Sequence, residues 1–396
     1  MGKSFSKFNY KSSNMDSIIF HHSDPNSDIS SDNTNSNTNS NTNSNSNSNT
    51  NIFNNSLNNS TLHFHTNYFN QSYIDNLLHL KNNIDSAKSS LDYDYLVFSG
   101  GGIKSFSFSG ALTALDKLGI LYDSTGKFKL KGLAGSSAGA IAASLLAIGY
   151  TPLELSDIIS NLDTSQFLDD DWNIIKDTIH FFDNYGIVKG DTFYDFIGKL
   201  IKHKTGDPDY TIDQLFIDSN IKLVIVGTNM NSNSSDYFFP NHPSFKNIPI
   251  RKAIRISMSI PFLFQPVLFN NHYYTDGGLL DNFPIHVFDG SFPGDVNARL
   301  HLVPCNLKVL GLNIISNSDY PNYNSNSPID HFYQFCSSFI TTFLNENERR
   351  VLTPYYWFRS INIITPNIPL YQFSLSPQQK FDLIKSGFDA ANDFFN

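Results

Sequence analysis

Hydrophobic positions follow two alternating periods from about residue 91 onward. Residues 91–99, LDYDYLVFS, form a short apolar run that predicts a buried strand. Residues 106–118 then place apolar side chains three and four apart, which predicts a helix ending at Gly119. The same plan follows in KFKLKGLA, whose alternation predicts a strand, and in residues 138–148, which predict a helix. A strand, a glycine-rich turn and a helix therefore occur twice in succession.

The rest of the folded region continues this alternation. Helical spacing recurs within 154–204, including a predicted helix at 172–182, and continuous apolar runs predict buried strands at Ile221–Met230 and Lys308–Ile315. A last helix begins at Ser376 with a proline in its first turn. The pattern predicts an α/β fold, with a mostly parallel central sheet flanked by helices on both faces.

The N-terminal part has a different composition. Residues 26–60 are almost entirely Asn, Ser and Thr, so they offer no apolar surface whose burial could offset the loss of chain entropy. We therefore predict a low-complexity, largely disordered region at 1–91 and one folded domain at 92–396. Within that domain the motifs described below occupy about 94–288, and 289–396 is a C-terminal extension.

Charge and cysteine content narrow the class of protein. The 396-residue chain has a formal net charge of −9 and no cluster of basic residues, which argues against nucleic-acid binding. Two cysteines are too few for a disulfide framework, and no N-terminal apolar segment is typical of a secretory signal. We expect an intracellular protein, cytoplasmic or peripherally membrane-associated and not secreted, without a stable protein partner. MGKSFS fits a myristoylation motif, which makes Gly2 a candidate lipidation site.

The uncharged segment 132–150, GLAGSSAGAIAASLLAIGY, allows two interpretations. Its small-residue pair Gly135 and Gly139 is typical of a membrane helix, but Ala, Ser and Gly at its centre and the strand pattern before it indicate a helix packed on a sheet. The same residues form a Gly-x-Ser-x-Gly motif around Ser137. Between a strand and a helix, this motif exposes the serine hydroxyl at the helix N-terminus, where the helix dipole favours negative charge.

A second glycine motif supplies hydrogen-bond donors. In SGGGIKS the backbone amides of Gly100, Gly101 and Gly102 can point to one place, and each such donor is worth about 2.7–4 kcal/mol against an oxyanion. Phosphate binding is disfavoured, because Ile103 precedes Lys104 where a P-loop has glycine, and a serine replaces the last glycine of a dinucleotide fingerprint.

A serine nucleophile also needs a base, and TDGGLLDNFPI offers one. Asp276 ends a predicted strand immediately before Gly277 and Gly278, so its carboxylate can lie in a tight turn at the edge of the sheet. A purely structural turn aspartate is the alternative interpretation of this Asp-Gly pair.

Together these motifs resemble the patatin-like phospholipase family. GGGIK at 100–104, GSSAG at 135–139 and DGGLLDNFPI at 276–285 occur in the family's order, and the likeness extends from about residue 92 to the C-terminus. The resemblance implies a lipid acyl hydrolase with a serine–aspartate dyad: Ser137 as nucleophile, Asp276 as base, and the amides of Gly100, Gly101 and Gly102 as oxyanion hole. It implies no metal or cofactor, and a lipid substrate met at a membrane or lipid interface.

Other residues of these motifs have supporting roles under this resemblance. Lys104 stands at the family's basic position, where it fixes the loop or meets an anionic head group. Ser105 replaces the glycine usual after it, so we expect adjusted loop geometry with activity retained.

Two alternatives to the dyad hydrolase stay open at this stage. The first is an α/β-hydrolase with a Ser-His-Asp triad, for which His286, His301 and His331 follow the acid in sequence. The second is a catalytically silent lipid-binding protein with the same fold.

Overall fold

The computed structural model describes residues 71–168, 184–316, 329, 332–351, 353–366, 368 and 372–396, all within a compact unit that spans Thr66–Asn396. The predictions for the N-terminal tail with Gly2, for the helix at 172–182 and for His331 lie outside the described residues. One helix, α2 at Gln71–Ser90, extends the ordered chain before residue 92, because its apolar residues recur at helical spacing and bury Ile84.

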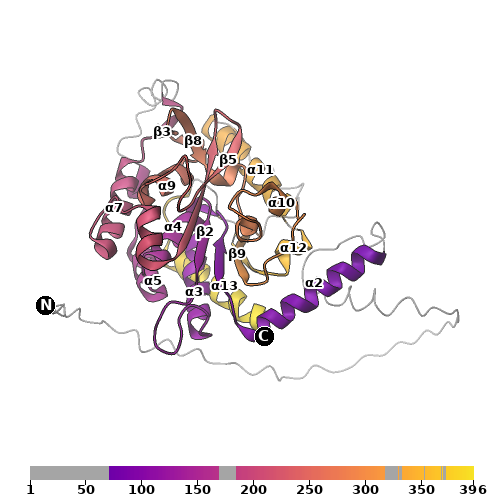
Figure 1. Ribbon diagram of the computed structural model, residues 1–396. Helices are drawn as coiled ribbons and strands as arrows, with labels where there is room; N and C mark the ends of the chain where they lie inside the picture. Colours follow the sequence, from indigo (N-terminus) through magenta and orange to yellow (C-terminus); the bar gives the residue numbers. More distant parts are fainter. Residues whose placement is uncertain are drawn as a thin grey trace, which may run out of the picture. The chain divides into compact units, whose positions relative to one another are not determined.

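Strands and helices alternate along the unit as predicted (Figure 1). The strands are β1 (Tyr95–Phe98), β2 (Gly132–Gly135), β3 (Gly186–Val188), β4 (Lys222–Asn229), β5 (Ser234–Phe238), β6 (Phe262–Phe264), β7 (Val267–Phe269), β8 (His272–Asp276), β9 (Val309–Ser316) and β10 (Ser360–Thr365). The α-helices after α2 are α3 (Ser107–Lys117), α4 (Ala138–Ala147), α5 (Pro152–Asn161), α7 (Asp191–Thr205), α8 (Ile212–Ser219), α9 (Ile250–Ser257), α10 (Val296–Arg299), α11 (Phe332–Val351), α12 (Pro354–Trp357) and α13 (Pro377–Phe395). Short 3-10 helices are η2 (Gly102–Phe106), η3 (Thr164–Leu168), η4 (Gly277–Leu279) and η5 (Ile285–Phe288).

The main sheet has the strand order β10-β9-β1-β2-β4-β8-β7, with β5 also paired to β4. The five strands from β10 to β4 run parallel, whereas β8, β7 and β5 are antiparallel to their neighbours. The prediction of a mostly parallel sheet is confirmed. One predicted strand is shorter than expected: β2 begins only at Gly132, and the alternating residues before it form a loop closed by a single bridge between Tyr122 and Phe128.

The two faces of the sheet are covered differently. Leu96, Phe98 and Leu133 point into the larger core, under the long helices α3, α4, α9 and α13. Val97 and Ala134 point the other way and pack against η5 and Tyr356 of α12. Alternate residues of each central strand are thus buried on opposite faces, which explains why these strands are apolar throughout.

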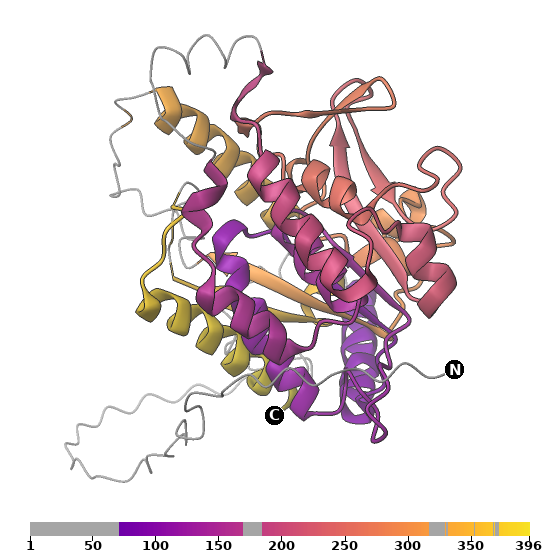
Figure 2. The same ribbon diagram turned by 90° about the vertical axis from the view of Figure 1, so that its left-hand side faces the viewer.

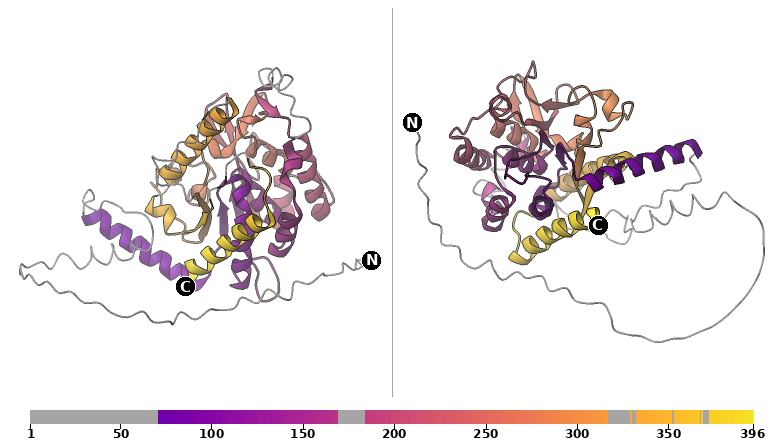
Figure 3. Two further views of the ribbon diagram at one scale, coloured as in Figure 1. Left: turned by 180° about the vertical axis from the view of Figure 1, so that it is seen from behind. Right: turned by 60° about the horizontal axis from the view of Figure 1, so that its bottom comes forward.

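The C-terminal extension completes this architecture. Strands β9 and β10 continue the sheet beside β1, and α13 crosses α3 at a pair of glycines (Figures 2 and 3). A β-carbon at Gly387 would lie 1.8 Å from the carbonyl oxygen of Ser107, and one at Gly110 would lie 1.8 Å from that of Ile384. The two backbones therefore touch, which fixes α13 against the helix that follows the glycine loop.

This crossing predicts the effect of one methyl group. Gly387→Ala should lower the free energy of unfolding by about 1–3 kcal/mol or more, because the added carbon meets backbone that cannot rotate away. Gly198→Ala in α7 is the matched control, since the nearest atom to its β-carbon is the end of the flexible Arg251 side chain, at 2.9 Å. Urea unfolding of both variants measures the difference, and equal stability of the two would contradict the tight crossing.

Candidate active site

Ser137 lies on the sharp turn between β2 and α4. Its φ of 51° and ψ of −129° are an uncommon combination for a residue with a side chain, and they aim the hydroxyl away from the strand at the start of a ten-residue helix. The flanking glycines make the turn sterically feasible. A β-carbon at Gly135 would lie 2.3 Å from the carbonyl oxygen of Gly139, and one at Gly139 would lie 2.4 Å from that of Ser99.

Three contacts hold Ser137 in this conformation. Its N–H donates to the hydroxyl of Ser257 at 2.9 Å, and its own hydroxyl donates to the Asp276 carboxylate, with 2.6 Å between Oγ and Oδ2. The sulfur of Met258 lies 3.7 Å from the same Oγ. Ser257 and Met258 stand at the end of α9, and no role was predicted for either of them. The structure thus brings together Ser137 and Asp276, which lie 139 residues apart.

Asp276 reaches this point on the last residue of β8. The antiparallel register pairs it with Gly227 of β4, and its backbone is fixed by an N–H bond to the Ser259 carbonyl and by the Thr228 hydroxyl on its own carbonyl, both 2.8 Å. The second carboxylate oxygen accepts the Gly278 N–H at 2.7 Å. Both oxygens of the buried carboxyl group therefore have hydrogen-bond donors.

Burial governs the protonation of this carboxyl group. The loss of solvation raises the pKa of Asp276 from 3.8 to about 7, against the lowering effect of its hydrogen bonds from Ser137 and Gly278. A carboxyl pKa near neutrality suits a general base, because the group can both accept and return a proton.

The glycine loop differs from the prediction at one position. The Gly100 N–H donates to the carbonyl of Asn282 at 2.8 Å, so it is engaged in the structure and is not a free donor for an oxyanion. Gly101 and Gly102 donate to no protein group in the described part of the chain, and Gly102 has a φ of 53° that favours glycine. The Lys104 N–H donates to the Gly101 carbonyl at 3.2 Å and closes the turn.

Asn282 joins the glycine loop to the aspartate turn. Its backbone carbonyl accepts the Gly100 N–H, and its side-chain oxygen lies close to two glycines. A β-carbon would lie 2.2 Å from this oxygen at Gly100 and 2.5 Å from it at Gly278. At Gly277, a β-carbon would lie 2.3 Å from the carbonyl oxygen of Val226 in β4. The backbone of β4 therefore leaves no room for a side chain at Gly277, and the Asn282 side chain packs closely against Gly100 and Gly278. The role of Asn282 was not predicted, although it stands in the DNFP stretch.

The histidines considered for a triad lie elsewhere. His286, in η5, is buried with Nε2 3.3 Å from Asp281, and burial lowers its pKa. His301 stacks on Tyr355, with 4.9 Å between ring centroids. Within the described ranges, no histidine forms a hydrogen bond with Ser137 or Asp276.

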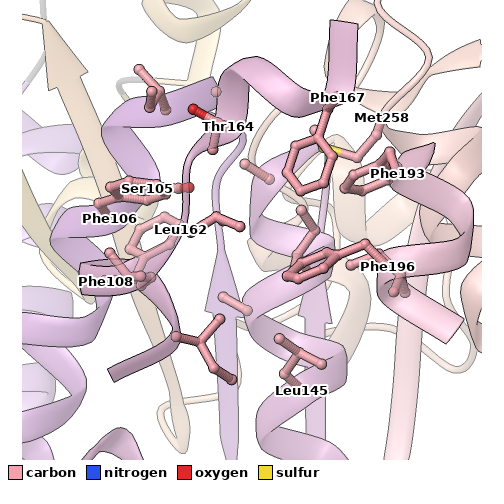
Figure 4. A pocket seen from close by; sticks show the side chains of 18 of the residues that line it. Ser105, Phe106, Phe108, Leu145, Leu162, Thr164, Phe167, Phe193, Phe196 and Met258 are labelled. Carbon is pink, nitrogen blue, oxygen red and sulfur yellow. The ribbon is translucent and has the colours of Figure 1, made fainter. Parts of the chain in front are cut away.

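An apolar cavity adjoins Ser137. Its volume is about 140 Å³, and Gly102, Ala138 and Met258 line the part next to the serine. One face of α4 contributes Ile141, Ala142 and Leu145 to the wall. Phe106 and Phe108 line one side, with Phe167, Phe193 and Phe196 opposite them (Figure 4). Its apolar walls suit an aliphatic group beside the serine.

The two arginines of α9 do not line this cavity. Arg255 is buried and donates to the Ser259 hydroxyl at 2.5 Å and to the carbonyls of Lys189 and Gln265. Arg251 binds both oxygens of Asp209 at 2.7 Å each. Arg255 therefore ties α9, which carries Ser257, to β3 and β6.

Two kinds of feature are absent from the described residues. They contain no group of three or more His, Cys, Asp or Glu side chains placed to hold a metal ion. None of their helices is both long enough and apolar enough to cross a bilayer.

The chain is similar to several known proteins. A family model described as Patatin-like phospholipase matches residues 96–289. The uncharacterized protein R571 of Acanthamoeba polyphaga mimivirus is 29% identical over 315 residues, covering 78% of this chain and 95% of that protein. The probable lipid hydrolase 463L of Invertebrate iridescent virus 6 is 27% identical over 195 residues, 49% of this chain and 63% of that protein, so this chain matches less than two thirds of its length. The crystal structure of VipD from Legionella pneumophila has the same fold, with 16% identity and a TM-score of 0.51 over 77% of this chain and 67% of that one.

The raised pKa of Asp276 predicts a pH-dependent cost to stability. The carboxyl loses its proton near pH 3.8 when unfolded and near pH 7 when folded, so its stabilising contribution is complete below pH 3.8 and lost as pH rises to 7. Neutral Asp276→Asn escapes this loss and should be more stable than wild type at pH 8, by at most roughly 4 kcal/mol for three pKa units, with a smaller difference at pH 5.

Urea unfolding at both pH values measures this effect. The exposed Asp393→Asn in α13 is the matched control and should show no such trend. An Asp276→Asn advantage that is equal at pH 5 and pH 8 would contradict a carboxyl pKa near 7.

Proposed function

Because residues 96–289 form a patatin-like phospholipase domain, we propose that this protein hydrolyses carboxylic ester bonds of lipids with a Ser137–Asp276 dyad. The observation that carries the proposal is the 2.6 Å hydrogen bond between Ser137 Oγ and Asp276 Oδ2, next to a cavity lined by apolar side chains. Substrates of the phospholipase A or lysophospholipase type fit this arrangement, because one acyl chain occupies the cavity and its ester carbonyl reaches the serine.

The reaction proceeds in two balanced half-reactions. Ionised Asp276 accepts the Ser137 proton as Oγ attacks the ester carbonyl, and the N–H groups of Gly101 and Gly102 stabilise the oxyanion. Asp276 then gives the proton to the leaving alcohol, and an acyl-serine forms. A water molecule attacks this ester while Asp276 accepts its proton. The released serine oxygen recovers that proton and the fatty acid leaves.

Gly100 and Asn282 act on the reaction by positioning. The Gly100 N–H on the Asn282 carbonyl orients the peptide that precedes the two oxyanion donors. The same asparagine fills the space beside Gly278, whose N–H binds the catalytic carboxylate. Through its backbone carbonyl and its side chain, Asn282 thus keeps the glycine loop and the base at a fixed separation.

Two observations favour the dyad over a triad. Both carboxylate oxygens of Asp276 are occupied by Ser137 and Gly278, which leaves no place for a histidine between acid and serine. His286 packs with Tyr237 under the opposite face of the sheet, in the smaller core that contains Val97. A lipid substrate brings the enzyme to a membrane or lipid surface, where it acts as a peripheral protein. The steps described above need no cofactor.

The dyad predicts which substitutions abolish turnover. Ser137→Ala and Asp276→Asn should each lower kcat for a soluble ester by about a thousandfold or more, because they remove the nucleophile or its base. His286→Gln, His301→Gln and His331→Gln should stay within about tenfold of wild type. Ester hydrolysis measures kcat, and a fluorophosphonate probe should label wild type at Ser137.

Thermal unfolding of each variant shows that loss of activity is not loss of fold. A folded histidine variant as inactive as Ser137→Ala would replace the dyad by a triad. Folded wild type that neither labels nor hydrolyses any ester would identify a catalytically silent lipid-binding protein.

The cavity predicts acyl-chain selectivity. Ala142→Phe adds a ring to the α4 wall, so it should lower kcat/KM for a sixteen-carbon acyl ester by about tenfold or more and change that for a four-carbon ester little. Leu153→Phe is the control, since this exposed residue at the start of α5 lies outside the cavity wall. Equal losses for both chain lengths would show that the acyl chain does not enter this cavity.

A further inference from the structure

Helix α11 carries more apolar surface than its packing uses. Among its described side chains, Cys336 and Ile340 are buried and Leu344 is half-buried, so this row faces the rest of the unit. A second row lies beside them at four-residue spacing: Phe335, Phe339 and Phe343, exposed by 57%, 45% and 44%. Exposed aromatic residues in a contiguous row are typical of an interaction surface and not of a solvated helix face.

This row lies close to the turn that carries the catalytic aspartate. Helix α11 packs against η4, which begins immediately after Asp276, and Ile340 shares a core cluster with Ile260 and Phe264. Those two residues also line the cavity beside Ser137. Figure 2 shows α11, in orange, along one edge of the unit.

Further aromatic side chains continue the row away from α11. The half-buried Phe262 has its ring centroid 6.5 Å from that of Phe339. It pairs in register with Gly186 of β3, which follows the exposed Tyr185 in the sequence, and the Tyr185 ring lies 5.7 Å from that of Tyr273. We call this set the aromatic rim; its members are Tyr185, Phe262, Tyr273, Phe335, Phe339 and Phe343.

The described side chains around the aromatic rim on α11 carry no charge. The described polar side chains on its section of α11 are Gln334, Ser338, Thr341 and Thr342, which carry no charge. The whole chain has a net charge of −9, which opposes attraction to an anionic membrane. Tyrosine and phenylalanine at the margin of an apolar surface fit the boundary between head groups and acyl chains.

We propose that the aromatic rim docks the protein on a bilayer of zwitterionic lipids, so that an acyl chain passes from the membrane into the cavity beside Ser137. The proposal rests on the proposed function for its substrate, and the core cluster shared by Ile340, Ile260 and Phe264 places the rim next to the cavity wall. Binding is driven by burial of the rim and not by charge, so salt has little effect on it.

The test separates docking from chemistry. Binding to phosphatidylcholine vesicles is measured by co-sedimentation of the full chain carrying Ser137→Ala, so that lipid is not consumed. Adding Phe335→Ser, Phe339→Ser and Phe343→Ser should weaken partitioning at least about 30-fold. Raising the salt concentration from about 0.1 M to about 0.5 M should change it less than about twofold.

A second exposed apolar group provides the matched control. Phe292→Ser, Leu300→Ser and Leu302→Ser remove a similar area around α10, away from the cavity wall, and should leave binding within about threefold. In the chain with Ser137 intact, the α11 triple variant should keep wild-type turnover of a soluble short-chain ester while losing hydrolysis of vesicle lipid.

Several results would overturn the docking proposal. The first is unchanged vesicle binding by a folded α11 triple variant, and the second is a loss of binding only in the α10 variant. The third is binding that requires anionic lipid. The fourth is a wild-type dimer that becomes a monomer in the α11 triple variant, measured by ultracentrifugation without lipid. The last result would assign the row to a second copy of the chain. Wild-type chain that binds vesicles through the rim but hydrolyses no ester would support docking while contradicting the proposed function.

Discussion

The structure depends on keeping one carboxyl group buried beside one serine. Asp276 has almost no solvent contact, and its pKa near 7 records what that burial costs in free energy. The cost is tolerated because two fixed donors, the Ser137 hydroxyl and the Gly278 amide, hold the carboxylate oxygens. Active sites often store such a local cost, which the packing of the surrounding domain must offset.

Close backbone packing makes this burial possible. A β-carbon would collide with backbone at Gly135, Gly139 and Gly277, and it would meet the end of a packed side chain at Gly100, Gly101 and Gly278. The glycine loop, the Ser137 turn and the Asp276 turn therefore pack closely around one site, and Asn282 fills the space between the glycine loop and the Asp276 turn. A side chain at these positions would push the nucleophile, the base or the oxyanion loop away from the others.

The part of the chain after residue 289 belongs to the same physical unit. Strands β9 and β10 extend the sheet next to β1, whose end carries the glycine loop, and α13 touches the backbone of α3 just beyond that loop. Helix α11 then covers the turn after Asp276. The matched family segment, 96–289, thus holds the motifs, while the extension supports them from outside.

Local chemistry explains what the sequence determined by itself. The alternation of strand and helix, the turn around Ser137 and the identity of the three motifs are set by residues close to one another along the chain, so periodicity and glycine placement could predict them. The fold class and the family resemblance were confirmed on that basis.

Only the tertiary structure decided how these parts meet. The antiparallel pairing of Asp276 with Gly227 sets the height of the base beside Ser137, and the Asn282 carbonyl engages the Gly100 N–H that the motif alone had assigned to an oxyanion. Such contacts join residues far apart in the sequence. Strand register and the packing of distant helices fix them, and no local pattern encodes either.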